Sequence, residues 1–253
     1  MCTLTIVPGC TEAAGCGNFR LAFNRDEEHS RPAAQPPEIE VHDSRYAILP
    51  RDPEGGGTWI AATDVGLAFA LLNVNPPGVS GISVGGLSRG VIIPALLAAD
   101  SIESAADMLP ASAHEVLRPF RLVVTDGRTW FEALGQMGTV TLQAHVLSEP
   151  IMRSSSGLGD QVVEGPRQSL FESMFAAQDR PLAEIQDDFH ASRIANHDEQ
   201  SVDMLREDAR TVSTAVITAT DTEVTMVYNP GAPRDKLSST RSALTRFDIT
   251  GAA

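Results

Sequence analysis

The residues best suited to chemistry are a thiol at position 2 and a charged run at residues 24–28, Asn-Arg-Asp-Glu-Glu. A small residue at position 2 usually permits removal of the initiator methionine, so we expect the mature chain to begin with Cys2. An N-terminal cysteine carries a nucleophile and a base together, because its neutral α-amine can take the proton of its own thiol. Their reference pKa values, about 7.7–8.0 for the amine and about 8.5 for the thiol, lie near working pH. A nearby arginine would favour the thiolate further.

Two alternating stretches, residues 2–7 and 19–24, are expected to bring the charged run beside this thiol. Apolar side chains recur at every second position, and Pro, Gly and Asn lie between the stretches, which predicts an antiparallel pair joined by a long loop. If the apolar faces match, Arg25 falls opposite Cys2, and a register slipped by two residues still leaves the charged run at the chain start. The alternative is that Cys2 is an incidental early residue and the charged run is a solvated turn.

The length and composition fit one large domain or two small ones, and no interior composition shift marks a boundary, so we expect a single domain over residues 1–253. With 42% hydrophobic residues, the chain can bury a sizeable core. Its formal net charge of −14 argues against a nucleic-acid partner, because phosphate binding needs a basic face. No apolar run is long enough to span a membrane, and residues 1–20 hold no apolar signal segment, so we expect a cytoplasmic protein. The sequence is compatible with a monomer and with a homo-oligomer.

The cysteines and histidines predict neither a metal site nor a cofactor. Cysteines at positions 2, 10 and 16 are too few for a disulfide framework, and their spacing does not fit a zinc knuckle. Cys10 and Cys16 could pair across their loop, although a reducing cytoplasm is expected. The six histidines are dispersed, with no pair at helical i, i+4 spacing. His29 and His42 lie in loops near the expected site, where a solvated side chain and a haem ligand are the two alternatives.

The order of elements predicts an α+β fold with two mainly antiparallel sheets. Strands rarely alternate singly with helices, which argues against a doubly wound parallel sheet. Two sheets with helices outside give a four-layer αββα sandwich, an arrangement common to hydrolases whose nucleophile is their first residue. Helices are expected at 89–99, at 100–109, from Pro166 and from Pro181, and loops at 29–43, at 154–159 and in the tail after 228. Further strands are expected at 46–49, 58–62, 67–73, 120–124, 129–133, 139–147, 211–218 and 223–228.

Several short motifs resemble the NRDE family, the family of the transport and Golgi organisation protein, over about residues 2–231. The specific combination is Asn-Arg-Asp-Glu after an N-terminal Met-Cys, followed about thirty residues on by Gly-Gly-Thr-Trp; each piece alone would be weak. The other matching motifs are residues 71–74, 88–90, 119–120 and 208–213. The family is in turn similar to N-terminal nucleophile hydrolases of the choloylglycine hydrolase and penicillin acylase type.

The resemblance implies roles for eight residues. In those hydrolases the N-terminal cysteine attacks an amide with an arginine and an aspartate beside it, which carries the catalytic roles onto Cys2, Arg25 and Asp26. By this reading Arg25 holds Cys2 as a thiolate and Asp26 orients the α-amine. The segment 66–73 looks like their strand with an oxyanion-hole asparagine, which implies that Asn73 stabilises the oxyanion by roughly 3–4 kcal/mol. Substrate contacts are expected from Asn24, Glu27, Trp59 and Arg210.

Two functions are compatible with the resemblance, and both have a small-molecule partner. The first is a cysteine-dependent hydrolase of a non-peptide amide bond, with Cys2 as nucleophile after removal of Met1 and with no cofactor. The second is a non-catalytic carrier of haem or a lipidic acyl compound on the same fold, since animal members of the NRDE family have been linked to haem movement and lipid metabolism. A second oxyanion asparagine of the hydrolases would fall near Glu149, which cannot donate a hydrogen bond when ionised.

Overall fold

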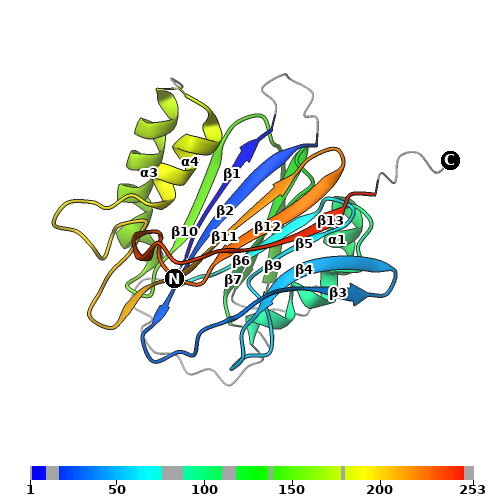
Figure 1. Ribbon diagram of the computed structural model, residues 1–253, viewed down its shortest axis with the longest axis horizontal. Coiled ribbons are helices and arrows are strands. Elements are labelled where there is room, and N and C mark those ends of the chain that lie inside the picture. Colours follow the sequence, from blue (N-terminus) through cyan, green and yellow to red (C-terminus); the bar gives the residue numbers. More distant parts are fainter. Residues whose placement is uncertain are drawn as a thin grey trace.

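Two antiparallel sheets stack face to face with helices on both outer sides (Figure 1). The computed structural model describes residues 2–9, 17–75, 88–109, 118–136, 139–177 and 180–247. The arrangement confirms the expected α+β, four-layer αββα sandwich. None of the helices in the described ranges has the length and apolar character needed to cross a bilayer.

The first sheet contains both strands of the hairpin that begins at Cys2. Within the described residues its strand order is β10-β1-β2-β11-β12-β13. Its strands are β1 Cys2–Pro8, β2 Phe19–Glu28, β10 Ile151–Ser155, β11 Ala209–Ala219, β12 Glu223–Asn229 and β13 Thr240–Thr245. Cys2 lies opposite Arg25 across the β1–β2 pair, as the matching of apolar faces predicts. On its other edge β1 pairs with β10, where Ser155 lies opposite Cys2. The thiol therefore starts a strand that is held on both sides.

The second sheet follows the chain order without a crossover in the described residues, β3-β4-β5-β6-β7-β8-β9. Its strands are β3 Gln35–His42, β4 Arg45–Arg51, β5 Ile60–Thr63, β6 Ala68–Asn73, β7 Phe120–Thr125, β8 Thr129–Gln136 and β9 Thr139–Val146. Each neighbouring pair is antiparallel, so each connection leaves one strand and enters the next at the same end of the sheet. Strand β6 ends at Asn73 on the side of the molecule where β1 begins.

Alternation along the strands divides the apolar residues into three cores. In β1, Leu4 and Ile6 face the second sheet, whereas Val7 packs against helices. Helices α3 (Asp160–Ala176) and α4 (Leu182–His190) cover the first sheet. The 3₁₀ turns η1 (Arg89–Val91) and η2 (Pro94–Leu96) and helix α1 (Ile102–Met108) cover the second, as Figure 1 shows for α1. The sheet-to-sheet core is the largest of the three.

Three expected loops contain strands instead. Residues 35–42 of the expected Pro-rich loop form β3, because it is an edge strand whose register shift between Gln35 and Glu38 absorbs the two prolines. Residues 151–155 form β10, and residues 240–245 of the expected tail form the other edge strand, β13. Their short or polar sequences carry little alternation, and pairing with long neighbouring strands stabilises them.

The helices also differ from expectation at their starts. Residues 89–99 form two 3₁₀ turns rather than one helix, because Pro94 lacks the N–H that a continuous helix would use. Helix α1 is capped by Ser101, which accepts a hydrogen bond from the Ser104 N–H at 3.1 Å. Helix α3 begins at Asp160 and keeps Pro166 inside it, since Val163 already belongs to its buried face. Helix α4 follows Pro181, as expected.

Candidate functional site

A cavity of about 300 Å³ opens where β1 begins and β2 ends. It brings together residues from both sheets and from the turn η1, and six of the eight residues expected from the sequence line it. These are Cys2, Arg25, Asp26, Glu27, Trp59 and Asn73. The hairpin register supplies the first three, since Cys2 and Arg25 are cross-strand partners and Asp26 follows directly. Residue 1 and the pair Cys10 and Cys16 lie outside the described residues.

The Cys2 thiol lies at the floor of this cavity with 8% of the residue exposed. Burial raises the pKa of the Cys2 thiol, and the Asp26 carboxylate acts in the same direction. The Asp26 backbone N–H, which donates to the sulfur, and the Arg25 guanidinium act in the opposite direction without outweighing burial. Burial therefore acts against the resting thiolate that the resemblance implies. A buried neutral thiol needs a base before it can attack, which is the task that an N-terminal amine performs.

Arg25 is fixed by an aromatic ring and two carboxylates. Its guanidinium carbon lies 4.3 Å from the centroid of the Trp59 ring, a cation–π contact between the two sheets. Its Nη2 lies 3.5 Å from a carboxylate oxygen of Glu27 and 3.5 Å from one of Asp52. With only 5% of the residue exposed, Arg25 is held as part of the cavity wall. Trp59 is thus the platform on which this arginine is positioned.

Arg31 and Asp52 complete this charged wall, and sequence reasoning did not select them. Arg31 Nη2 donates to Asp52 Oδ2 at 2.5 Å, and Arg31 Nε lies 3.5 Å from Glu27. Although burial alone would raise it, the pKa of Asp52 lies below its usual value because the Arg31 hydrogen bond and charge outweigh burial. Asp52 opens the Gly-rich turn before Trp59, so its place next to the conspicuous glycines was the available signal.

The Asp26 carboxyl group lies behind the thiol, toward helix α3. Thr211 Oγ1 donates to Asp26 Oδ1 at 2.6 Å, and Arg167 Nη2 lies 3.8 Å from Asp26 Oδ2. Burial raises the pKa of Asp26, and the Arg167 charge opposes that shift. Arg167 also donates to Thr3 Oγ1 at 2.7 Å, next to Cys2 in β1. This fully buried arginine thus connects α3 to the first strand and to the aspartate.

Sequence reasoning missed Arg167, although a signal was present. Residues 163, 167, 171 and 175 share the buried face of α3, and three of them are apolar. An arginine in such a stripe must have buried partners, because a charge is costly to bury alone. Its partners are the Gln200 and Ser201 carbonyls and the two groups already described. The loop before β11 is therefore held to α3 by the same side chain that faces Asp26.

Two glycine motifs interlock at the cavity rim. The Thr58 N–H donates to the Gly90 carbonyl at 3.1 Å. A Cβ placed on Gly57 would lie 2.4 Å from the Gly90 carbonyl carbon, so only glycine fits there. This close approach docks the segment 88–90 onto the start of β5 and places Arg89 in the cavity lining. Arg89 Nη1 donates to the Pro119 carbonyl at 2.9 Å, which fixes the direction of the side chain.

Asn73 lines the cavity from the last position of β6. Its side-chain amide is a neutral donor, as an oxyanion site requires. The residue expected at a second amide position, Glu149, does not belong to this site. Strand β10 begins at Ile151 opposite Ile6, so exposed Glu149 lies toward the far end of β1 from Cys2. The carboxylate at position 149 therefore says nothing about the chemistry at Cys2.

Asn24 and Arg210 do not line this cavity. Asn24 is fully buried under α4, where its amide donates to the carbonyls of His190 and Val202 at 2.8 and 2.9 Å. These bonds explain the asparagine structurally and remove it from the expected substrate contacts. Arg210 lines a neighbouring cavity of about 290 Å³ and lies 3.5 Å from Asp235. That cavity shares Arg25 with the first, so the two adjoin along β2.

The histidines near the site are not clustered. His29 lines the neighbouring cavity and its Nε2 lies 3.3 Å from the Arg206 carbonyl oxygen. His42 is in β3 and contacts Glu40 at 3.2 Å. Within the described ranges, no group of three or more His, Cys, Asp or Glu side chains is arranged to hold a metal ion.

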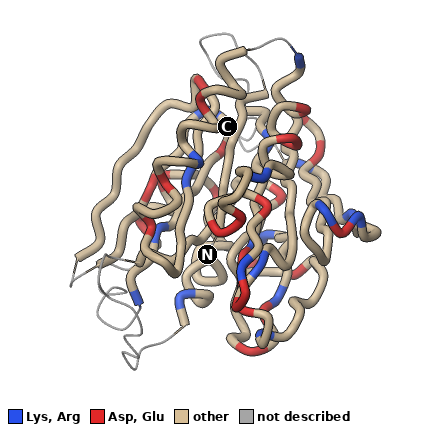
Figure 2. Tube along the Cα trace, turned by 90° about the vertical axis from the view of Figure 1, so that its left-hand side faces the viewer, with Lys and Arg blue, Asp and Glu red and all other residues tan. Residues whose placement is uncertain are grey.

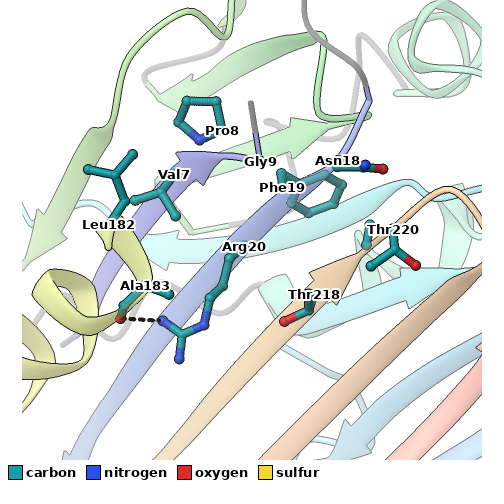
Figure 3. Close-up of a pocket in the computed structure, with 11 residues that line it drawn as sticks. Val7, Pro8, Gly9, Asn18, Phe19, Arg20, Leu182, Ala183, Thr218 and Thr220 are labelled. Carbon is teal, nitrogen blue, oxygen red and sulfur yellow. Dashed lines mark hydrogen bonds between the residues drawn. The ribbon is translucent and has the colours of Figure 1, made fainter. Parts of the chain in front are cut away.

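A larger cavity of about 490 Å³ lies at the opposite end of β1 and β2 (Figure 3). Val7, Pro8 and Phe19 contribute to its lining, together with Leu182 at the start of α4. The charged side chain among its described lining residues, Arg20, turns toward α4 and donates to the Ala183 carbonyl at 3.3 Å (Figure 3). No thiol lies among the described residues that line it. The smaller cavity at Cys2 is therefore the better candidate for chemistry.

The fold is that of the N-terminal nucleophile hydrolases. Penicillin V acylase from Agrobacterium tumefaciens has a TM-score of 0.56 at 11% identity, covering 99% of this chain and 86% of the acylase. The Caenorhabditis elegans ortholog of N-acylethanolamine-hydrolyzing acid amidase has a TM-score of 0.55 at 9% identity, covering 85% and 92%. The C2A mutant of conjugated bile acid hydrolase from Clostridium perfringens has a TM-score of 0.51 at 10% identity, covering 99% and 93%. At such identities the similarity shows the fold alone.

The chain belongs to the family described as Transport and Golgi organisation 2, which it matches over residues 1–228. The match confirms the resemblance to the NRDE family that the motifs indicated. No curated protein sequence matches the chain significantly.

Proposed function

We propose that this protein hydrolyses a non-peptide amide bond of a small molecule, with Cys2 as the nucleophile after removal of Met1. The observation that carries the proposal is the pairing of Cys2 with Arg25 at the floor of a cavity that also contains Asp26 and Asn73. The fold shared with amide-cleaving acylases supports it. In this position a cysteine at the chain start has its own amine within reach, and a substrate can approach from the cavity.

The first half of the reaction forms a thioester. The neutral α-amine of Cys2 takes the thiol proton while Sγ attacks the amide carbon, and the carbonyl oxygen becomes an oxyanion. The Asn73 amide donates to that oxyanion. The protonated α-amine then gives its proton to the amide nitrogen, the C–N bond breaks and the amine leaves. Asp26, close behind the thiol, orients the α-amine, and its own position is held by Thr211 and Arg167.

The second half releases the acid. Water enters, the α-amine takes one of its protons, and the resulting hydroxide attacks the thioester carbon. Collapse of the second tetrahedral intermediate breaks the C–S bond and returns the proton to sulfur. The positive charge of Arg25 lowers the pKa of the Cys2 thiol, and the contact with Trp59 holds Arg25 in place. Glu27 contributes by holding Arg25 and Arg31 in position.

A panel of free amides tests the proposal, with amine release as the readout. We expect turnover by the processed protein and none by Cys2→Ala, which removes the nucleophile but keeps a small residue at position 2. Circular dichroism and thermal unfolding must be unchanged in the variant, so that loss of activity reports chemistry. Trapping of a substrate-derived acyl group on the Cys2 peptide, detected by mass, would identify the thioester directly. Equal turnover by the wild type and Cys2→Ala would overturn the proposal.

We propose a non-catalytic carrier of an acyl compound or haem as the second candidate. The neighbouring cavity favours it, since Pro32, Ala33, Val212 and Tyr228 give that cavity an apolar wall. This function predicts stoichiometric binding that survives Cys2→Ala. His29→Ala separates the two ligands, because a haem ligand at His29 would be lost and acyl binding would be kept. No saturable binding of either ligand by the processed protein would rule this candidate out.

A further inference from the structure

Only some of the charged side chains that line the Cys2 cavity form ion pairs with one another. Four arginines and four carboxylates line it, and one of the carboxylates, Glu28, is exposed and accepts a hydrogen bond from Ser30. Glu27 and Asp52 lie within 3.5 Å of Arg25 and Arg31. Asp26 faces Arg167, which is outside the lining. The two further lining arginines are Arg89 and Arg118.

Arg89 and Arg118 have no carboxylate within 4.0 Å among the residues that the structure describes. Arg89 is partly buried, and its polar contact is the Pro119 carbonyl, a neutral acceptor. Burial, and after it the charge of Arg118, lowers the pKa of Arg89 to about 10, whereas Cys2 and Glu27 act in the opposite direction, so Arg89 stays protonated at neutral pH. The cavity therefore holds two arginines without an ion-pair partner among the described residues.

The position of Arg89 is built into the fold. Gly57 and Gly90 meet backbone to backbone, and the Thr58 N–H donates to the Gly90 carbonyl, so the residue between Ser88 and Gly90 cannot withdraw from the cavity. A guanidinium held by one carbonyl at its Nη1 keeps its other N–H groups for a ligand. Such a fork suits carboxylate or phosphate oxygens.

The protein around these two arginines is strongly acidic. The chain carries a net charge of −14, and its acidic residues are spread over many elements (Figure 2). A diffusing anion is repelled by most of such a surface, whereas arginines without an ion-pair partner attract it at short range. The guanidinium groups of Arg89 and Arg118 therefore favour a ligand that carries its own negative charge to this place.

We propose that the Cys2 cavity selects amides that carry an anionic oxygen group, and that Arg89 and Arg118 bind that group. The catalytic part of this statement rests on the proposed hydrolase function, whereas the binding part does not. Binding of the anionic group to Arg89 and Arg118 sets the amide at a fixed distance from Sγ of Cys2. The shared chemistry of the ligand is an oxyanion, carboxylate or phosphate, next to an amide.

Calorimetric titration of the Cys2→Ala variant tests the binding part without turnover. Three ligand pairs differ only in the anionic group: N-hexanoylglycine and its carboxamide, N-hexylsuccinamic acid and its carboxamide, and N-hexanoyl-O-phosphoethanolamine and N-hexanoylethanolamine. The first two place a carboxylate on the amine or the acyl side, and the third replaces carboxylate by phosphate. We expect the anionic member of at least one pair to bind at least about tenfold more tightly than its neutral partner.

Substitution of the arginines assigns the preference. In the Cys2→Ala background, Arg89→Gln and Arg118→Gln should each reduce it severalfold, whereas the control Arg241→Gln, on exposed β13, should leave it unchanged. Arg118 is exposed, so Arg118→Gln tests the proposal even where Arg89→Gln disturbs folding. Equal binding within all three pairs, no binding of any anionic member, or an unchanged preference in both variants would overturn it. If the protein binds the anionic members more tightly but the native protein turns none of them over, the hydrolase proposal is rejected and the anion-binding inference is kept. If the native protein turns over neutral amides and binds both members of each pair equally, the hydrolase proposal is kept and the anion-binding inference is rejected.

Discussion

Cys2 and Arg25 face each other across the β1–β2 pair, and the Asp26 backbone N–H next to them donates to the thiol sulfur. This relationship places the nucleophile, a cation and a backbone donor within one cross-strand position. It also explains why the chemistry lies at this end of the sheet: the start of β1 and the end of β2 coincide there. Because the thiol is buried, its reactivity is set by neighbours more than by solvent.

The pH dependence of Cys2 alkylation should report this environment. Burial raises the pKa of the Cys2 thiol, so its alkylation by iodoacetamide should be slow at neutral pH and rise about tenfold per pH unit until the raised pKa is reached. Arg25→Gln removes a charge that lowers this pKa, so the rate at a given pH should fall. Fragmentation of the N-terminal peptide by tandem mass spectrometry separates Cys2 from Cys10 and Cys16.

Arg241→Gln is the matched control for this experiment, since it removes an arginine from an exposed strand far from the thiol in sequence and outside the cavity lining. Its alkylation profile should match that of the wild type. A rate that is already maximal at neutral pH would contradict the raised pKa.

The contact between Gly57 and Gly90 predicts a strong position-specific effect. Gly57→Ala would place a methyl group 2.4 Å from the Gly90 carbonyl carbon, so the backbone must move. We expect a loss of about 1–3 kcal/mol in the free energy of unfolding, measured by urea denaturation. Ligand binding in the Cys2 cavity should weaken as well, because Arg89 moves with Gly90.

Gly165→Ala provides the opposite case. Gly165 is an exposed helical residue with nothing within 4 Å of an added Cβ apart from its own helix and chain neighbours, so alanine there should change the free energy of unfolding less than Gly57→Ala does, its helix propensity being offset by the following Pro166. If Gly57→Ala were as stable as Gly165→Ala, the interlocking of the two glycine motifs would be wrong.

The pair of Arg167 and Asp26 predicts strong thermodynamic coupling. Arg167→Met leaves a buried carboxylate without its cation and should lower the free energy of unfolding by about 3–5 kcal/mol. Asp26→Asn in the same chain should recover part of that loss, because the uncompensated charge is gone. A double-mutant cycle in urea measures the coupling; strictly additive effects would show that the two side chains do not interact.

His190 predicts a specific acid sensitivity. Burial lowers the pKa of His190 from 6.5 to about 3, with Arg20 and Arg167 contributing in the same direction. The unfolded chain therefore binds a proton below about pH 6.5 that the folded chain does not, so folding loses stability as pH falls, by at most about 1.4 kcal/mol per pH unit. The loss should cease below about pH 3, where the folded form also binds the proton.

His190→Gln should flatten this dependence. The imidazole of His190 lies between Asn24 Oδ1 at 2.8 Å and Thr5 Oγ1 at 2.7 Å, and glutamine offers a neutral polar group in its place. Urea denaturation between about pH 7 and about pH 4.5 should show a smaller slope for the variant than for the wild type. Identical slopes would mean that His190 is not the buried neutral base described here.

Local pattern predicted the parts of the structure that alternation controls. Apolar residues at every second position set the register of β1 and β2, and so placed Arg25 opposite Cys2. Strands β3, β10 and β13 were not predicted, because their sequences alternate weakly and they are stabilised by pairing with other strands. Alternation reports which face a residue occupies, and it does not report which partner strand completes an edge.

The proximity of site residues could be predicted within one hairpin, and it could not be predicted between segments that are far apart in the sequence. Cys2, Arg25 and Asp26 belong to a single hairpin, so their proximity follows from local order. Arg167 and Thr211 reach Asp26 from segments far along the chain, and no local pattern sets their distance.

The role of Cys2 is tested most directly by the intact mass of the protein purified from its own host, together with N-terminal sequencing. The proposed mechanism needs the α-amine of Cys2 to be free, because that amine is the base for the buried thiol. We predict a mass that lacks Met1 and a first sequencing residue of Cys2. Quantitative retention of Met1 would contradict the mechanism, since a peptide bond would then occupy the only nitrogen that the proposed reaction uses as a base.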